Sequence, residues 1–377
     1  MRVLHVINGL GGGGAERLLT WLLPGLVTKG VTPEVFALSK ESPFFLGDLK
    51  KAGIKVRFSK TRKLYSILQI DAIRKEIVEN NYDLVHVHLF PAQLWCSIAI
   101  SGTRIPLITT EHSTSNRRRN KVVFKLFDSY MYSRMGKVIC ISNGTRDNLC
   151  NWVPKICSKT TVVHNGIEIH RFSEALPYEK ARLVSGLTEN DKIILMVSRF
   201  SPQKDQDTLV RALALLPEQF HVVFVGDGDR RKNVEHLTTS LHLSKRVHFL
   251  GNREDVPRIM KTADVLVQSS HWEGFGLTVV EAMATGLPVI ASDVSGVREI
   301  AQGYGIVFQP GNHVELAGVI AECLQREINY DKITEMKKAA EKYSISNMVE
   351  NYLQLYVDLA ASTSQKTNFF CKGNDET

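Results

Sequence analysis

One stretch in the second half of the chain decides the fold: His271-Trp272-Glu273-Gly274-Phe275-Gly276-Leu277-Thr278-Val279-Val280-Glu281-Ala282-Met283-Ala284-Thr285-Gly286-Leu287-Pro288. It joins a glycine-rich turn to a helix, and Gly286 and Pro288 then end that helix. Short apolar runs at Val265–Gln268 and Pro288–Ala291 flank the stretch and read as strands. A strand, a helix and a second strand make up a βαβ unit, so a parallel sheet is expected here.

The same alternation extends outward over both halves of the chain. Its 377 residues exceed the roughly 250–300 that a single core accommodates. We therefore expect an α/β protein with two Rossmann-like domains. The other expected strands are Arg2–Asn8, Pro33–Ser39, Leu84–His88, Pro106–Thr110, Lys192–Ser198, His221–Val225 and Arg246–Leu250, and the expected helices include Ala15–Lys29, Ile67–Asn80, Thr208–Leu216 and Thr278–Ala284.

The domain boundary is expected at an Asn-Gly turn. Asn165-Gly166 closes an apolar run, and a polar, irregular segment follows it. We predict a first domain over residues 1–166 and a second over 167–345. A closing helix is predicted over 346–361 from its apolar spacing, and a flexible tail over the polar residues 362–377.

Composition favours a soluble protein. Hydrophobic residues make up 44% and charged residues 23%, near the average for globular proteins. No apolar run approaches the roughly 20 residues that span a bilayer, and the first apolar run is too short for a signal peptide, so a cytoplasmic location is expected. Six scattered cysteines without a C-x-x-C pair are expected to be reduced thiols. They are Cys96, Cys140, Cys150, Cys157, Cys323 and Cys371.

Positive charge is concentrated in the first half. Residues 1–165 carry 24 basic and 11 acidic side chains, or +13, whereas residues 166–377 carry 23 and 28, or −5. Such an asymmetry suits an anionic membrane surface or a nucleic acid, and a solvated face without a partner is equally open. The basic positions include the run Arg117–Lys121 and Lys50, Lys51, Lys55, Arg57, Lys60, Arg62 and Lys63.

A glycine-rich loop follows the first expected strand. It runs from Gly9 to Gly14 and satisfies G-x-G-x-x-G at the start of a helix. A dinucleotide site would need an acid at the end of the second strand, which reads Leu38-Ser39-Lys40 instead. A loop that needs positive φ merely to turn is a second alternative. We favour a loop close to a substrate phosphate or acceptor, with Gly12, Gly13 and Gly14 as its binding residues.

The quoted stretch also carries chemistry. Backbone amides at the positive end of a helix suit a diphosphate, and the carboxylates of Glu273 and Glu281 suit sugar and ribose hydroxyls. Thr278 and Glu281 also have capping-box spacing, which would give Glu281 a structural role. Glu273 lies outside the helix and has no evident structural task.

Two cations follow the first strand of the second half. Arg199 and Lys204 are expected at the carboxyl end of that strand, where open α/β sheets bind ligands and where cations can neutralise a leaving diphosphate. Asp227-Gly228-Asp229 spells the D-x-D of metal-dependent enzymes but ends a strand in a glycine turn. No metal site is expected there.

Together these residues resemble glycosyltransferase family 4, a group of retaining enzymes with the two-domain architecture called GT-B. The resemblance covers about Met1 to Ala361. Its most specific elements are the spacing of Glu273 and Glu281 and the segment from Ser198 to Asp205. It implies an interdomain cleft that opens and closes by hinge motion, and a C-terminal helix that crosses back to the first domain.

The resemblance also implies residue roles in the second domain. Glu281 would bind the ribose and Glu273 the donor sugar. Arg199 and Lys204 would hold the diphosphate, aided by the backbone amides of Gly276, Leu277 and Thr278. The base would lie near Arg253 in the loop Leu250–Asp255. The amides and side chains expected to line the donor are those of Gly274, Phe275, Gly276, Leu277 and Thr278.

In the first domain, His112 in Thr110-Glu111-His112-Ser113 looks like the strand-end histidine of the family, which faces the donor sugar and helps to position the acceptor. His112, Glu273, Arg199 and Lys204 are the implied catalytic residues.

The implied reaction is sugar transfer with retention of configuration, without a metal or a cofactor, from a nucleotide diphosphate sugar that is UDP-linked by family frequency. The acceptor would be lipid-linked or a saccharide in the biosynthesis of O-antigen, capsule or a similar cell-surface polysaccharide. Peripheral contact of the first domain with the cytosolic face of the inner membrane is expected, and no nucleic acid. The alternatives are a nucleotide-sugar epimerase of the same fold and a noncatalytic nucleic-acid-binding protein.

Overall fold

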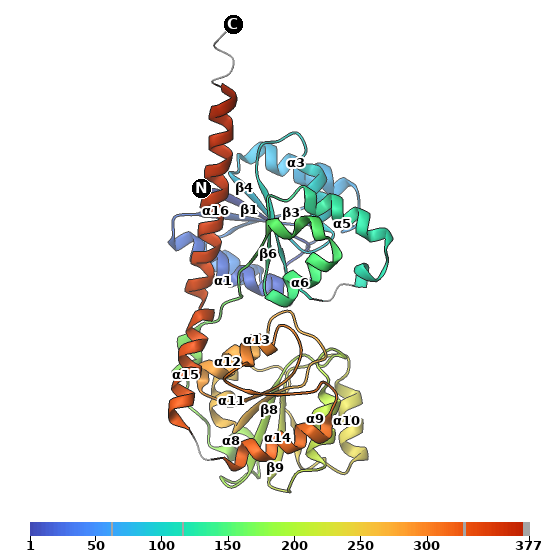
Figure 1. Ribbon diagram of the computed structural model, residues 1–377, viewed down its shortest axis with the longest axis vertical. Helices are drawn as coiled ribbons and strands as arrows, with labels where there is room; N and C mark the ends of the chain where they lie inside the picture. The colour runs from blue at the N-terminus through green and yellow to red at the C-terminus, as the bar shows by residue number, and fades with distance from the viewer. Residues whose placement is uncertain (62, 115–116, 327–328, 372–377) are drawn as a thin grey trace. The chain divides into compact units, whose positions relative to one another are not determined.

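The computed structural model describes residues 1–61, 63–114, 117–326 and 329–371 (Figure 1). These residues form two compact units. One contains Met1–Gly166 together with the chain from Ile345 onward, and the other contains Ile167–Ser344.

The first unit is built on a seven-stranded parallel sheet in the order β3-β2-β1-β4-β5-β6-β7. Helices cover both faces of this sheet, and an apolar core lies on each side. The strands are β1 (Arg2–Ile7), β2 (Thr32–Ala37), β3 (Lys55–Phe58), β4 (Leu84–His88), β5 (Leu107–Glu111), β6 (Lys137–Cys140) and β7 (Thr160–Val162). The helices are α1 (Gly14–Thr28), α2 (Leu46–Lys51), α3 (Leu68–Asn80), α4 (Ala92–Ala99), η1 (Arg117–Asn120), α5 (Val123–Ser133), α6 (Asn143–Trp152), η2 (Pro154–Lys159) and α16 (Ile345–Cys371).

The second unit has a six-stranded parallel sheet in the order β10-β9-β8-β11-β12-β13. Its strands are β8 (Lys192–Val197), β9 (Phe220–Val225), β10 (Val247–Phe249), β11 (Val265–Gln268), β12 (Val289–Ser292) and β13 (Ile306–Phe308). Its helices are α7 (Ile169–Ser173), α8 (Lys180–Leu183), α9 (Gln206–Leu213), α10 (Arg231–Ser240), α11 (Val256–Thr262), α12 (Leu277–Thr285), α13 (Arg298–Ala301), α14 (His313–Gln325), α15 (Tyr330–Ala340) and η3 (Glu341–Tyr343). The two parallel sheets confirm the predicted α/β class.

The C-terminal helix α16 belongs to the first unit and packs on α1. A Cβ added to Gly25 of α1 would lie 2.4 Å from a methyl carbon of Val349, so this glycine permits the close approach. The helix continues past Ala361, where its end was predicted, to Cys371, because no glycine or proline interrupts residues 362–371. The rest of the predicted tail, 372–377, lies outside the described residues.

One pair of cysteines in this unit differs from the prediction. Cys150 on α6 and Cys157 on η2 form a disulfide with a Cα–Cα distance of 5.3 Å, which corrects the prediction of six reduced thiols. The turn between the two elements brings these cysteines together.

Within the described part of the chain, no helix has the length and apolarity that crossing a bilayer requires.

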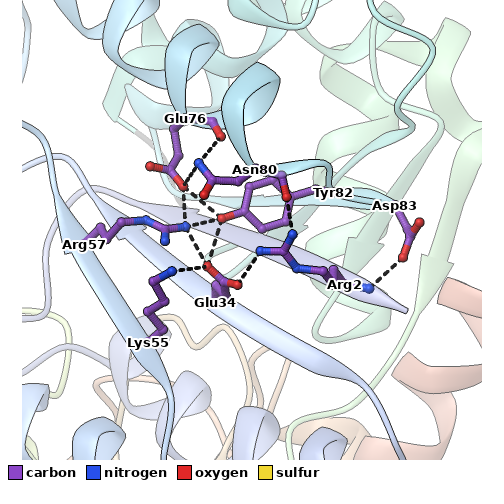
Figure 2. A network of polar contacts seen from close by, with 8 residues as sticks. All are labelled: Arg2, Glu34, Lys55, Arg57, Glu76, Asn80, Tyr82 and Asp83. Carbon is purple, nitrogen blue, oxygen red and sulfur yellow. Dashed lines mark hydrogen bonds and ion pairs between the residues drawn. The ribbon is translucent and has the colours of Figure 1, made fainter.

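A polar network ties strands β1, β2 and β3 together (Figure 2). Glu34 of β2 accepts from Arg2 at 2.7 Å and from Arg57 at 2.6 Å, and the hydroxyl of Tyr82 donates to it at 3.0 Å. Arg57 also pairs with Glu76 of α3. Glu34 is therefore a structural acid, and Arg57 is not part of a free basic face.

The basic run at 117–121 is also corrected in part. Arg118 pairs with Asp128 at 3.1 Å and Arg119 with Glu111 at 3.0 Å, and each arginine side chain is only 7% exposed. Both charges are therefore neutralised inside the first unit. Lys121 is exposed, whereas the side chain of Arg117 and the whole of Arg62 lie outside what the structure describes.

Candidate functional site

In the second unit, the predicted site residues follow two neighbouring strands. The strand order reverses between β8 and β11, and the loops after these strands carry Lys204 and Glu273. Such a switch point is where open α/β sheets bind ligands, because the loops diverge there at the carboxyl edge. The fold thus brings together two segments that are far apart in the sequence.

Glu273 and Lys204 form an ion pair at this edge. The distance from Lys204 Nζ to Glu273 Oε1 is 2.5 Å, and the side chains are 21% and 6% exposed, respectively. Gln268 and Ser270 donate to the same carboxylate oxygen at 2.8 and 2.7 Å. Gln203 also donates to the other oxygen, Oε2, at 3.5 Å. The inference that Glu273 has no structural task is therefore wrong, because the carboxylate is buried and held by four side chains.

Backbone contacts hold the two loops against each other. The His271 amide donates to Gln203 O at 2.8 Å, and the Gln203 side chain donates to Trp272 O, also at 2.8 Å. Ser269 Oγ donates to Asp205 O at 2.7 Å. The ion pair therefore rests on a scaffold that fixes both partners before any ligand binds.

Arg199 lies on the same loop as Lys204 but is exposed. Its carbonyl oxygen accepts from Gln206 at 3.0 Å, while its guanidinium has no hydrogen-bond or ion-pair partner among the described residues. The loop packs tightly against the glycine turn after β9. A Cβ on Gly226, where φ is +127°, would lie 2.1 Å from Ser198 O, so only glycine fits.

The start of α12 excludes the capping box. The helix begins at Leu277 with Gly276 as its N-cap, so Thr278 is not the cap residue. Of the three amides predicted to hold a diphosphate, Gly276 N–H donates to Gly296 O at 3.0 Å and Leu277 N–H to Phe275 O at 2.9 Å. Among the described residues, only the Thr278 amide of these three has no backbone acceptor, which leaves it available at the positive helix end.

Three of the remaining predicted donor residues lie on this turn and helix, and Arg253 lies in the loop after β10. Glu281 is half-buried on α12, while Gly274 and Phe275 precede the helix. The guanidinium of Arg253 is held by Asp255 at 2.8 and 2.6 Å, so its side chain is engaged within its own loop. The predicted role of Arg253 near the base would therefore fall to its backbone.

In the first unit, the glycine loop lies at the carboxyl end of β1. None of the described glycines from Gly9 to Gly14 has a positive φ, which excludes a loop that needs glycine merely to turn. Apart from the residues next to each glycine in the chain and the backbone of α1 itself, no described atom lies within 4 Å of a Cβ built on Gly11, Gly12 or Gly14. Neither backbone strain nor crowding among the described residues explains these three glycines, whereas a Cβ on Gly13 would lie 2.3 Å from a carboxylate oxygen of Glu16.

His112 follows β5 at the same edge and is linked to buried histidines. Its Nε2 lies 3.2 Å from Nδ1 of His88, and Nε2 of His88 lies 3.2 Å from Nδ1 of His5. Burial lowers the pKa of His112 to about 4 and that of His5 to about 3, so both are neutral near pH 7. The Nε2 of His5 has no partner among the described atoms, so the favoured tautomer of His5 carries its proton on Nδ1. His5 then donates to Nε2 of His88, and Nδ1 of His88 donates to Nε2 of His112. The proton of His112 is therefore on Nδ1.

Among the described residues, the side chains close enough together to hold a metal are His5, His86 and His88, whose ligand atoms lie within 4.8 Å of one another. Hydrogen bonds already explain this group. His86 bonds Tyr356 at 2.6 Å and Thr110 at 2.8 Å, which uses both of its nitrogens. The D-x-D motif at 227–229 is not in such a group.

The sequence reasoning missed the residues that orient the predicted ones. Gln268 and Ser270 hold Glu273, and His88 holds His112. The run Gln268-Ser269-Ser270 at the end of a buried strand was a usable signal, because polar residues at the carboxyl end of a parallel strand often face a site. His86-Val87-His88 in a buried strand was another.

Two family profiles match the chain. The profile "Glycosyltransferase Family 4" matches residues 12–171, and "Glycosyl transferases group 1" matches residues 178–365. Between them they span both units.

Individual proteins are similar over most of their length. A UDP-Gal:alpha-D-GlcNAc-diphosphoundecaprenol alpha-1,3-galactosyltransferase of Escherichia coli is 26% identical over 310 residues, which is 77% of this chain and 79% of that enzyme. An N-acetyl-alpha-D-glucosaminyl L-malate synthase of Bacillus anthracis is 24% identical over 299 residues, 74% of this chain and 75% of that one. HepE of Anabaena, solved in complex with UDP, has the same fold, with a TM-score of 0.84 at 24% identity over 95% of this chain and all of that one.

Proposed function

The chain belongs to glycosyltransferase family 4, and from this premise we propose that it transfers a sugar from a UDP-sugar to a lipid-linked or saccharide acceptor with retention of configuration. The two profiles make it a glycosyltransferase. The donor, the acceptor class and the stereochemistry are our proposal, and the geometry of the second unit supports its donor part.

One observation carries the proposal: the Lys204–Glu273 pair at the switch point of the second sheet. An ammonium group has three N–H donors. Among the described residues, the ammonium of Lys204 makes one hydrogen bond, to Glu273. The others can reach a phosphate oxygen, and Oε2 of Glu273, which lies 3.5 Å from Nε2 of Gln203, has the lone pairs to accept from a sugar hydroxyl as well. A single pair can thus bind both ends of the bond that breaks.

The charges fit the reaction. As the bond between the anomeric carbon and the diphosphate oxygen breaks, negative charge grows on the diphosphate. We propose that Lys204, Arg199 and the amide of Thr278 stabilise that charge without a metal. Glu281 would accept hydrogen bonds from the ribose hydroxyls, where a carboxylate is a strong acceptor.

His112 is proposed to act as a neutral hydrogen-bonding group in the first unit. With a pKa of about 4 it carries no charge near pH 7, so it neither repels a cationic group nor attracts the diphosphate. Its hydrogen bond to His88 fixes the ring orientation. We propose that it positions the acceptor or the donor sugar, with the glycine loop close by on the same sheet edge.

The acceptor is proposed to be presented at a membrane during cell-surface polysaccharide assembly. The name of the Escherichia coli relative identifies a diphosphoundecaprenol acceptor, which supports a lipid-linked acceptor here. A peripheral location on the cytosolic face of the inner membrane follows as part of this proposal. The internal pairing of Arg118 and Arg119 weakens the nucleic-acid alternative.

The test is a product assay with a panel of UDP-sugars and diphosphoundecaprenol-linked sugars. Transfer to the acceptor, with the new bond in the anomeric configuration of the donor, supports the proposal. Interconversion of the UDP-sugar without acceptor would identify an epimerase instead. Binding of no UDP-sugar at all would overturn the donor assignment.

A further inference from the structure

Helix α5 carries an apolar face that points outward. Val122, Val123, Leu126, Phe127 and Tyr130 are between 46% and 77% exposed. Positions 123, 126, 127 and 130 recur at the spacing of one helix face. Scattered exposed apolar residues are ordinary, but five on one short face form a patch of the kind that marks an interaction site.

The inner face of the same helix is already occupied. Asp128, Met131 and Tyr132 are buried in the first unit, and Asp128 accepts from Trp152 at 2.9 Å and pairs with Arg118. These buried polar contacts fix the rotation of α5. The helix therefore cannot turn its apolar face inward without leaving Asp128 and Arg118 unpaired in the core.

The exposed charged residues on this helix and at its ends all have one sign. Lys121, Lys125 and Arg134 are exposed, and the single acid among the described residues 121–134, Asp128, is buried. Residues 121–134 therefore combine an apolar stripe with flanking cations, and their acid is buried. It lies on the side of the first unit opposite α16, because α5 contributes to one core of that unit and α16 to the other (Figure 1).

We propose that α5 lies in the surface of an anionic membrane, with Leu126 and Phe127 at the level of the upper acyl chains and Lys121 and Lys125 among the headgroups. Interfacial helices have this combination, since apolar burial supplies affinity and cations select anionic lipid. The inference deepens the proposed membrane-associated acceptor and rests on it. It also differs from docking by charge alone, because Arg118 and Arg119 are not available to the lipid.

A second copy of the chain or another protein is less suited to this face. A protein interface of stable size needs roughly 800 Å² from each partner, and the apolar stripe is confined to about two turns of one helix. A protein partner would also need acids opposite the flanking lysines, whereas an anionic bilayer supplies negative charge at every point around them.

The experiment uses the full chain and sedimentation with vesicles of phosphatidylglycerol and phosphatidylcholine, or of phosphatidylcholine alone. Wild type should bind the anionic vesicles. Leu126→Ser with Phe127→Ser should weaken that binding by at least ~10-fold, from the apolar surface lost. Lys121→Gln and Lys125→Gln should each weaken it roughly fivefold at low salt. A matched control is Leu176→Ser with Val314→Ser, two exposed apolar residues of the second unit, which should bind as wild type does.

Two further readouts keep the outcomes separate. UDP-sugar binding should be unchanged in all of these variants, so failure of UDP-sugar binding in wild type would overturn the proposed function and leave the membrane result standing. Equal vesicle binding by the α5 variants and the control would overturn the membrane inference. A change of molecular mass in solution for the Leu126 and Phe127 variant, without loss of vesicle binding, would assign the face to a second copy and would also overturn it.

Discussion

The ammonium of Lys204 and the carboxylate of Glu273 meet at 2.5 Å across two loops that leave neighbouring parallel strands. Each loop is fastened to the other through its backbone, and Gln268 and Ser270 complete the shell of the carboxylate. The pair is preorganised without a ligand. Its orientation therefore costs little at the moment of reaction.

Replacing either partner should lower kcat strongly while the protein still folds. Glu273→Gln keeps the shape and should lower kcat at least ~100-fold, through loss of a preorganised charge. Lys204→Met should do the same and should also lower the free energy of unfolding by up to about 3 kcal/mol, because Glu273 stays buried. Steady-state kinetics and denaturant unfolding measure the two effects.

The control for these variants is Glu350→Gln, which breaks the exposed pair of Glu350 with Lys29 on the surface of the first unit. It should change neither quantity by a measurable amount. The double variant should be no slower than the slower single one, since the two side chains act as a unit. Near-normal turnover in Glu273→Gln would contradict the site.

Glu281→Gln should separate binding from chemistry. Glu281 is half-buried on α12 and is not part of the Lys204 pair. Loss of a charged acceptor for ribose hydroxyls should weaken UDP-sugar binding about tenfold or more while kcat at saturation changes little. Calorimetric titration with UDP and with UDP-sugar measures this. A large fall in kcat with unchanged affinity would place Glu281 at the reacting sugar instead.

A substitution in the glycine loop should change the kinetics without lowering the stability of the protein. Gly12 has no positive φ and open space around its absent Cβ among the described residues. Gly12→Ala should therefore leave the stability unchanged or raise it by about 0.4–1 kcal/mol, through a less flexible unfolded chain. If a ligand approaches this backbone closely, the same change should raise KM or lower kcat. An unaffected enzyme would show that the loop lies away from both substrates.

The buried histidines should make stability depend on pH. The folded pKa of His5 is lowered to about 3 by burial, below its ordinary value near 6.5, so the unfolded chain binds its proton first as pH falls. This contribution is complete above pH 6.5 and is lost on acidification. Between pH 7 and pH 5 it amounts to about 2 kcal/mol for this one group.

His5→Gln should therefore reduce the loss of unfolding free energy between pH 7 and pH 5 by about 2 kcal/mol relative to wild type. His170→Gln is the matched control, because that side chain is 90% exposed. Urea unfolding at the two pH values is the measurement. The same pH slope in both variants would show that His5 titrates normally in the folded state.

The fold was readable from the sequence because its signal is local. Each βαβ unit shows in the alternation of apolar runs and helical patterns, and the strand predicted at Lys192–Ser198 is β8 at Lys192–Val197. The positions of Arg199, Lys204 and Glu273 at strand ends followed from the same pattern, because parallel strands share a carboxyl edge.

The partners of these residues were not readable, because they depend on tertiary contacts. Nothing local showed that Glu273 is held by Gln268 and Ser270. Likewise, a run of arginines indicates a basic surface only if the side chains reach solvent, and Arg118 and Arg119 instead pair with acids on neighbouring elements. Charge counted along a chain therefore overstated the basic face.

The most direct test is calorimetric titration of the wild-type chain and of Lys204→Met with a panel of UDP-sugars. We predict that wild type binds at least one UDP-sugar, and that the ligand at a hundred times its Kd adds about 2.7 kcal/mol to the free energy of unfolding. Lys204→Met should bind that ligand at least ~10-fold more weakly, because a cation at the diphosphate is lost. Equal affinity in the two proteins, or no affinity for any UDP-sugar, would contradict the assignment of the diphosphate to the Lys204–Glu273 pair.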